Sequence, residues 1–132
     1  MINDSKLTFI INTIKEAYAI FGKLDKSSLT DKAMFDLVTS TDYNIENYII
    51  SKIKEQYPQD RILSEETNSQ TIVEQGQSTW TIDPIDGTYN MANGIKIYGI
   101  QCAVYIGSAL YLAAVYLPHF DEDTVLKVVD AL

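Results

Sequence analysis

Two stretches in the first half of the chain repeat apolar residues at the spacing of an α-helix. The first has Asp4 or Ser5 as a candidate cap and Gly22 as its expected end. The second ends before Pro58, which cannot continue a helix. The apolar positions recur every three or four residues, at Leu7, Ile10, Ile14, Tyr18 and Phe21 and again at Ile45, Tyr48, Ile49, Ile53 and Tyr57. The pattern therefore predicts two amphipathic helices.

Between these helical patterns the chain is first polar and then briefly apolar. We expect Leu37 and Val38 to form a short strand, after which the second helix begins near Asp42. Lys32 lies in the loop expected before Asp36 and is expected at the surface. The sequence does not decide whether Lys32 reaches a functional site.

The second half of the chain favours strands. Residues 61–63 predict a short strand, and Trp80 and Ile82 predict another that ends at Asp83. The polar residues 67–79 between them predict a loop or a weak hairpin.

Residues 99–117 are almost uninterrupted apolar sequence, which approaches the length of a membrane-spanning helix. The Gly107-Ser108 pair divides this stretch into two runs rich in tyrosine, valine and isoleucine, which suit strands. A buried hairpin has the same hydropathy as a membrane helix, so the turn signal decides in favour of the hairpin.

The order of these elements is helix, strand, helix and then mostly strands, which predicts an α+β fold. We expect a layered arrangement in which two N-terminal helices pack on one side of a mostly antiparallel sheet. The chain has 132 residues, of which 46% are hydrophobic, and this suffices for one core but not for two. Residues 1–132 are therefore expected to form a single domain, or part of a larger one.

The charge of the chain limits its partners. A formal net charge of -8 argues against nonspecific binding to nucleic acid, which requires a basic surface. The N-terminus MINDSK lacks the features of a signal peptide, and Cys102, the single cysteine, cannot form an internal disulfide. We therefore expect a cytoplasmic protein that binds neither nucleic acid nor membranes.

Four carboxylates lie near the ends of predicted elements, where side chains can converge at the edge of a sheet. They are Asp42, Glu65, Asp83 and Asp86. Convergent carboxylates repel one another unless a proton or a cation neutralises them, and magnesium suits such oxygen ligands best when phosphate is also present. The single histidine, His119, and the single cysteine cannot build a usual zinc site, and His119 is expected as an exposed loop residue.

The stretch WTIDPIDGTYN, residues 80–90, joins two of these carboxylates to a glycine and a threonine. Gly87 lets a ligand approach the backbone, and amides at the start of a helix point at an anion. The hydroxyl of Thr88 can orient a water molecule, and Asp42 can accept a proton from that water. Together these groups fit the metal-assisted hydrolysis of a phosphate ester.

Each of these residues also has a purely structural explanation. Asp42 can cap a helix, residues 84–87 can form a β-turn, and Glu65 can be a solvated surface residue. Cys102 is expected to be a small core residue. Only the combination of residues favours the phosphatase interpretation.

Three segments of the chain resemble, in order, the motifs of one enzyme family. WTIDPIDGTYN resembles the signature of the inositol monophosphatase family of magnesium-dependent, lithium-sensitive phosphatases. DLVTSTD, residues 36–42, and SEET, residues 64–67, resemble two further motifs of this family. The resemblance extends over essentially the whole chain and implies the N-terminal, metal-binding half of the inositol monophosphatase fold.

The resemblance also implies a role for each matching residue. Four positions would supply oxygen ligands to magnesium, namely Glu65, Asp83, Asp86 and the carbonyl of Ile85. Asp83 would bridge two ions, which would explain why it lies so close to Asp86, with Pro84 stiffening the turn between them. Thr88 would pair with Asp42 to activate the attacking water, and the amides of Gly87 and Thr88 would hold the phosphate.

Members of the family are considerably longer, and their second half supplies a Trp-Asp motif that completes the metal site. We expect a phosphomonoesterase for inositol monophosphate or a related sugar or nucleotide phosphate, impaired as this short chain. The alternative is a catalytically inactive remnant that serves as a metal-binding or interaction module. Because the missing half would leave apolar surface exposed, we also expect a homodimer or other self-association.

Overall fold

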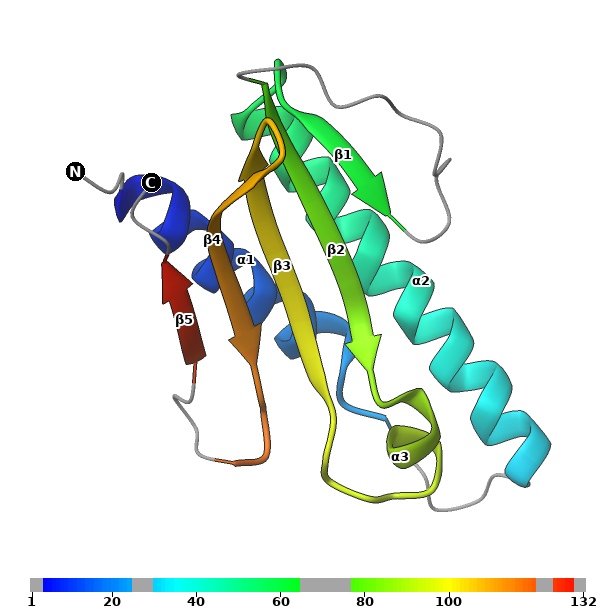
Figure 1. The fold of residues 1–132 in the computed structure, drawn as a ribbon. Helices are drawn as coiled ribbons and strands as arrows, with labels where there is room; N and C mark the ends of the chain where they lie inside the picture. Colours follow the sequence, from blue (N-terminus) through cyan, green and yellow to red (C-terminus); the bar gives the residue numbers. More distant parts are fainter. Residues whose placement is uncertain (1–3, 25–29, 65–76, 121–124, 130–132) are drawn as a thin grey trace.

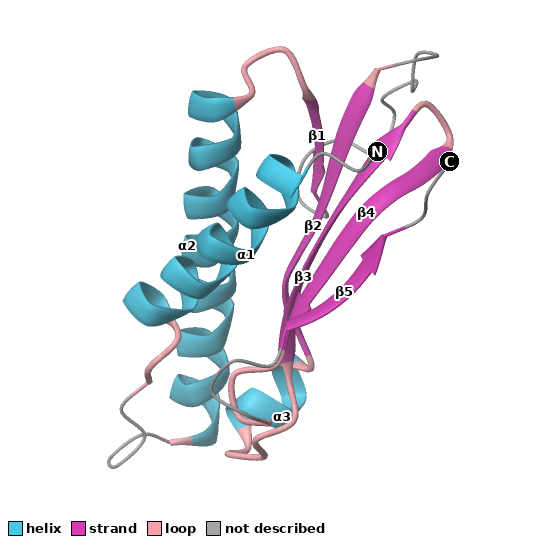
Figure 2. Cartoon of the chain, turned by 90° about the vertical axis from the view of Figure 1, so that its left-hand side faces the viewer, coloured by secondary structure: helices cyan, strands magenta, loops and turns pink. Residues whose placement is uncertain are grey.

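In the computed structural model the chain forms two layers, a five-stranded sheet and two long helices that cover one of its faces (Figures 1 and 2). The structure describes residues 4–24, 30–64, 77–120 and 125–129. The strands, in the order in which they lie side by side, are β1 (Arg61–Ser64), β2 (Ser78–Asp86), β3 (Gly99–Ile106), β4 (Ala109–Tyr116) and β5 (Val125–Val129). β1 is parallel to β2, and all other neighbours are antiparallel. The predicted α+β fold with a mostly antiparallel sheet is confirmed.

The first helix, α1 (Asp4–Phe21), follows the predicted period and ends before Gly22, as expected. A close contact explains why glycine stands there. The N–H of Gly22 donates to the carbonyl of Tyr18 at 2.7 Å, and the Tyr18 ring lies against the glycine. A Cβ atom at Gly22 would lie 2.1 Å from this ring, so only glycine leaves it room.

The second helix, α2 (Asp31–Gln56), is longer than the sequence predicts. It begins after Thr30, whose hydroxyl accepts a hydrogen bond from the N–H of Ala33 at 3.2 Å. The expected strand at Leu37 and Val38 is wrong, because the helical spacing of buried side chains continues backward from the predicted helix. These side chains are Met34, Val38, Thr41 and Ile45.

β3 and β4 form the predicted hairpin, with Gly107 in its turn at a φ of 60°. Their residues pair from Ile100 and Tyr116 at the open end to Ile106 and Ala109 at the turn. The apolar stretch that approaches the length of a membrane helix is therefore sheet. Within the described ranges, no helix is both long enough and apolar enough to cross a membrane.

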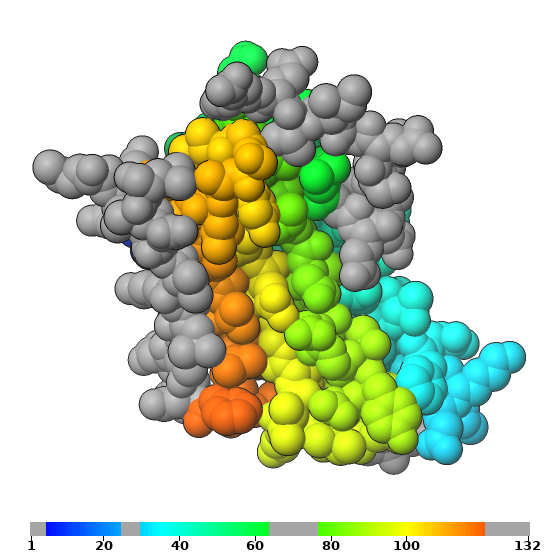
Figure 3. Space-filling view, viewed as in Figure 1, coloured from blue at the N-terminus to red at the C-terminus, as the bar shows by residue number. Residues whose placement is uncertain are grey.

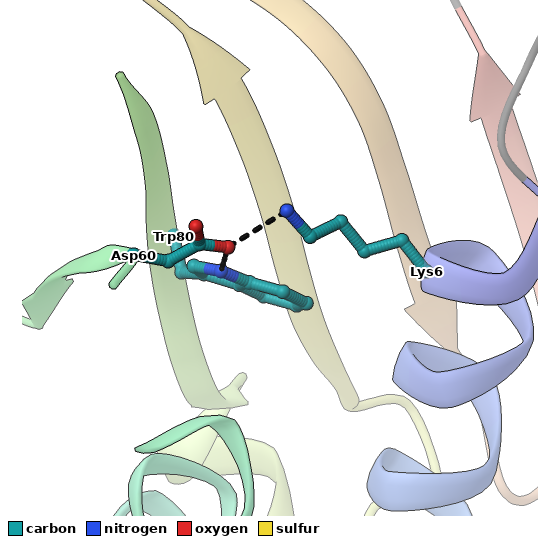
Figure 4. A network of polar contacts seen from close by, with 3 residues as sticks. All are labelled: Lys6, Asp60 and Trp80. Atoms are coloured by element: carbon teal, nitrogen blue, oxygen red, sulfur yellow. Dashed lines mark hydrogen bonds and ion pairs between the residues drawn. The ribbon is translucent and has the colours of Figure 1, made fainter. Parts of the chain in front are cut away.

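The core lies between the helices and the inner face of the sheet, and Trp80 is its largest fully buried side chain. The indole N–H of Trp80 donates to Oδ2 of Asp60 at 2.8 Å (Figure 4). The same oxygen forms an ion pair with Nζ of Lys6 at 2.7 Å. Cys102 is buried beneath the helices, as predicted. These contacts tie α1 to β2 and to the residue that precedes β1.

The opposite face of the sheet, here called the outer face, is turned toward the viewer in Figures 1 and 3. Paired residues of neighbouring strands point to the same side, and successive residues alternate between sides. Because Cys102 and Val104 are buried under the helices, Ala103 between them lies on the outer face, and so do its partners on the neighbouring strands. The outer face carries Thr81, Ala103, Tyr105, Leu110, Ala113 and Val115, all partly exposed.

Candidate active site

The two aspartates of the segment 80–90 lie on β2 and not in a turn. The strand continues through Pro84 to Asp86, so both the β-turn at residues 84–87 and the stiffened turn between the aspartates are wrong. Asp83 pairs with Gln101 and Asp86 pairs with Gly99, with an irregular register between the two pairs. Three steps along β2 thus match two steps along β3, as in a β-bulge. A proline is tolerated at such an irregularity.

The bulge decides the direction of the second carboxylate. In a regular strand, residues three apart point to opposite faces. Gln101 is the partner of Asp83 on β3, so both side chains lie on the outer face. Nε2 of Gln101 also donates to Oδ2 of Asp86 at 2.7 Å, which places the Asp86 carboxylate on the same face. Asp83, Gln101 and Asp86 therefore gather on the outer face, at the end of β2, while Ile85 is buried.

After Asp86 the chain turns into a short helix, α3 (Thr88–Ala92). Gly87 has a φ of 95°, a conformation that L-residues with a side chain rarely adopt. A Cβ atom at Gly87 would also lie 3.0 Å from the carbonyl oxygen of Ile97. Nδ2 of Asn90 donates to the same oxygen at 2.8 Å and ties α3 to the loop before β3. The prediction that a helix begins at this point of the motif is confirmed, with Thr88 exposed at its first position.

Asp42 lies in the middle of α2, so the expectation that it begins or caps a helix is wrong. α2 packs against both β2 and α3. Two turns before Asp42, the ring of Phe35 contacts the ring of Tyr89 in α3, with centroids 6.4 Å apart. The partly buried Asp42 therefore belongs to the helix that flanks Thr88.

Glu65 lies outside the described residues. β1 ends at Ser64, whose partner on β2 is Ile82, the residue before Asp83. Among the residues that the structure describes, no three histidine, cysteine, aspartate or glutamate side chains lie close enough to hold a metal ion. Lys32 is exposed, as expected, but it lies in the first turn of α2 and not in a loop.

The donor atoms at the end of β2 are of the chemical type that hard divalent cations bind. The carboxylates of Asp83 and Asp86 and the carbonyl of Ile85 are oxygen donors, which magnesium and calcium prefer. Softer donors lie elsewhere, because Cys102 is in the core and Nε2 of His119 is hydrogen-bonded to Tyr98 at 2.6 Å. The described part of the site thus offers the right ligands but fewer than a complete metal site needs.

Gln101 is a residue of this site that the sequence analysis does not single out. It was detectable in principle, since it is the only amide side chain in the apolar strand β3. Its hydrogen bond to Asp86 shows why a polar residue stands there. Only the register of β3 against β2 reveals that it lies between the two aspartates.

Comparison with known proteins supports this arrangement. The inositol monophosphatase family matches residues 4–128 of the chain. The inositol monophosphatase of Dictyostelium discoideum is 38% identical over 92 residues, which are 69% of this chain and 34% of that protein. The fructose-1,6-bisphosphatase/inositol-1-monophosphatase of Aquifex aeolicus is 32% identical over 102 residues, 77% of this chain and 38% of that protein.

The fold is also found in solved structures. Inositol monophosphatase II from Staphylococcus aureus superposes with a TM-score of 0.80 at 28% identity, covering 96% of this chain and 47% of that chain. This chain therefore spans a third to a half of the length of these relatives. Since sequence and fold agree over nearly every residue from α1 to β5, this chain belongs to the inositol monophosphatase family.

Proposed function

We propose that this chain provides the cation- and phosphate-binding half of a magnesium-dependent phosphomonoesterase. The observation that carries the proposal is the bulge in β2, which turns Asp83 and Asp86 to the same face beside Gln101. Two carboxylates that share one site repel each other, and a bound cation removes this repulsion. The start of α3, where a phosphate would bind, follows Asp86 directly.

Each residue of the site has a role in this proposal. Asp83, Asp86 and the carbonyl of Ile85 would hold magnesium, together with Glu65 from the segment that follows β1. Bound magnesium would supply a Lewis acid that neutralises the phosphate and acidifies a water molecule.

The backbone N–H groups of Gly87 and Thr88 would donate to phosphate oxygens. The Thr88 hydroxyl would orient the attacking water, and Asp42 would accept its proton. The exposure of Thr88 and the position of Asp42 on the flanking helix support this division of roles.

The substrate is proposed to be a small phosphorylated sugar or cyclitol, with inositol monophosphate as the first candidate and nucleotide phosphates next. The names of the relatives include both inositol monophosphate and fructose 1,6-bisphosphate as substrates of those proteins. We further propose that residues 1–132 act as one domain and that the protein is cytoplasmic. One continuous core and a single, buried, unpaired thiol support these two points.

The test measures magnesium binding by calorimetry and phosphate release from inositol monophosphate, for the wild-type chain and two variants. Asp83→Asn should abolish saturable magnesium binding, because it removes a charged ligand. Asp42→Asn should leave magnesium binding unchanged but lower phosphate release by about 100-fold or more, as expected for loss of a general base.

Asp31→Asn is the matched control, because Asp31 is an exposed aspartate of α2 outside the motif at residues 36–42. It should behave as the wild type in both measurements. A wild-type chain that binds no magnesium and releases no phosphate would contradict the proposal, as would an Asp83→Asn variant with unchanged binding.

The outer face is proposed to mediate self-association of the chain. It presents partly exposed apolar side chains, among them Tyr105, Leu110 and Val115, with no described helix packed on it. Sedimentation velocity at increasing concentration should show a dimer, and Leu110→Lys should shift the equilibrium toward the monomer. A wild-type chain that stays monomeric at the highest concentration would overturn this proposal.

A further inference from the structure

A small pocket lies near α3 and includes neither of the outer-face aspartates. It has a volume of about 290 Å³ and is formed by the end of α1, by α3, by the loop before β3 and by the turn after β4. Eight residues line it, namely Tyr18, Gly22, Lys23, Leu24, Met91, Lys96, Tyr98 and His119. None of the residues proposed to bind metal or phosphate is among them.

One wall of the pocket is a cluster of three polar side chains from three separate parts of the chain. The hydroxyl of Tyr98 lies 2.6 Å from Nε2 of His119 and 3.1 Å from the hydroxyl of Tyr18. The Tyr18 hydroxyl is also 3.3 Å from Nε2 of His119. Both tyrosines are buried, whereas His119 is exposed, as the sequence predicts.

The buried position of Tyr98 keeps its hydroxyl protonated. Burial, with a further contribution from the hydrogen bond to Tyr18, raises the pKa of Tyr98 above its usual range. The Tyr98 hydroxyl therefore keeps its proton at neutral pH. The contact of Gly22 with the Tyr18 ring helps to hold the cluster in place.

The charge of the pocket is opposite to that of the whole chain. The chain has 18 acidic and 10 basic residues, yet within the described ranges two lysines and no carboxylate line this pocket. Lys23 and Lys96 reach it from different loops, and both are exposed. Two lysines that line one pocket attract anions, and the field is strongest where low-dielectric walls surround it.

The floor of the pocket is apolar. Met91 is 1% exposed and Leu24 is partly buried. A pocket with a few convergent polar groups over an apolar floor is the usual form of a small-molecule site. Its volume suits a small molecule better than a macromolecular partner.

We propose that this pocket binds a small oxyanion, a phosphate or carboxylate group on a short apolar body. Lys23 and Lys96 contact the charged group, the cluster of Tyr18, Tyr98 and His119 offers polar contacts, and Leu24 and Met91 contact the apolar body. This site is distinct from the phosphate position at Gly87 and Thr88, and its occupancy requires no magnesium.

The experiment uses His119 as its reporter, because it is the only histidine in the chain. Its imidazole proton resonances are followed by NMR while inorganic phosphate is added to the full chain, without divalent cations and at fixed pH and ionic strength. We expect a shift that saturates. A parallel titration with succinate distinguishes the two anion classes, since the tighter of the two identifies the preferred one.

The double variant Lys23→Met/Lys96→Met should weaken the affinity for the preferred anion by about tenfold or more, because charge-assisted hydrogen bonds are lost. Lys32→Met/Lys54→Met is the control, since it changes the net charge equally through two exposed lysines of α2. It should bind as the wild type does.

Two results would overturn the inference. One is a linear shift without saturation for both anions, and the other is an equal affinity of the two double variants, which would indicate a general charge effect. Because magnesium and phosphate release play no part in this titration, its outcome is independent of the proposed phosphatase activity.

Discussion

At the scale of single residues, Asp60 organises the contacts around the central tryptophan. Its Oδ2 accepts a hydrogen bond from the indole N–H of Trp80 and forms an ion pair with Lys6. The side chains of Lys6 and Asp60 are 14% and 15% exposed. Nζ of Lys6 also lies 4.6 Å from the ring centroid of Tyr57 and 5.6 Å from that of Trp80. Trp80 is fully buried, so its indole N–H would lose its hydrogen-bond partner if Asp60 were removed. The hydrogen bond to the indole should therefore contribute more to stability than the partly exposed ion pair does.

We therefore predict that Asp60→Ala lowers the free energy of unfolding by about 2 kcal/mol. Lys6→Met should cost less than about 1 kcal/mol, because it keeps the apolar stem and the indole hydrogen bond. Urea unfolding measures both, with the exposed Asp36→Ala as the reference. If Asp60→Ala and Asp36→Ala are equally stable, the hydrogen bond to the indole contributes nothing.

At the scale of elements, the bulge in β2 and the start of α3 form one unit. The irregular register between Asp83 and Asp86 turns both carboxylates outward, and Gly87 then reverses the chain into α3. Met91 anchors α3 in the core, and the N–H of Met91 donates to the carbonyl of Gly87 at 3.0 Å.

Gly87→Ala tests this unit. We predict that it lowers stability by about 1–3 kcal/mol, because alanine is strained at a φ of 95° and its Cβ approaches the Ile97 carbonyl. Phosphate release should fall further than stability alone explains, since α3 must shift. Thr30→Ala offers a comparison, because losing this cap costs about 1 kcal/mol without changing Gly87 or any residue of α3. Equal phosphate release by Gly87→Ala and Thr30→Ala would contradict this prediction, because it would show that a change at the start of α3 does not affect activity.

The elements also show where prediction from sequence succeeds. Helical spacing and the Gly107-Ser108 turn depend on neighbouring residues, so α1, the second half of α2 and the hairpin are as predicted. The strand expected at Leu37 and Val38 is wrong because a two-residue apolar pair carries no period, and only the full length of α2 reveals their helical face. Pro84 and Gly87 predict a turn by composition, whereas pairing with β3 keeps the chain extended as far as Asp86, and the chain turns only at Gly87.

At the scale of the whole molecule, stability depends on keeping ionisable groups neutral in the core. Complete burial raises the pKa of the Cys102 thiol from 9.0 to about 12. The folded state therefore holds this proton at pH values where the unfolded chain releases it. The resulting stabilisation is complete below pH 9 and is lost as pH rises from 9 toward 12. Tyr98, whose pKa is also raised, acts in the same direction at higher pH.

We predict that the free energy of unfolding falls by up to about 1.4 kcal/mol per pH unit above pH 9. Cys102→Ala should remove this slope between about pH 9 and pH 10, before tyrosines titrate. Its stability at neutral pH should be slightly lower, because a small cavity remains. Urea unfolding across this pH range measures the slope, and an unchanged slope in the variant would exclude the thiol as its source.

The sequence by itself determined the helices that have a period, the hairpin that has a turn signal, and the motif residues Asp83, Asp86, Gly87 and Thr88 with the family that they indicate. These features follow from local spacing and residue type. Tertiary structure alone decided that Asp83 and Asp86 share a face, that Gln101 lies between them, and that Lys23 and Lys96 meet at one pocket. Such relations depend on strand register and on the packing of distant segments, which spacing along the chain does not encode.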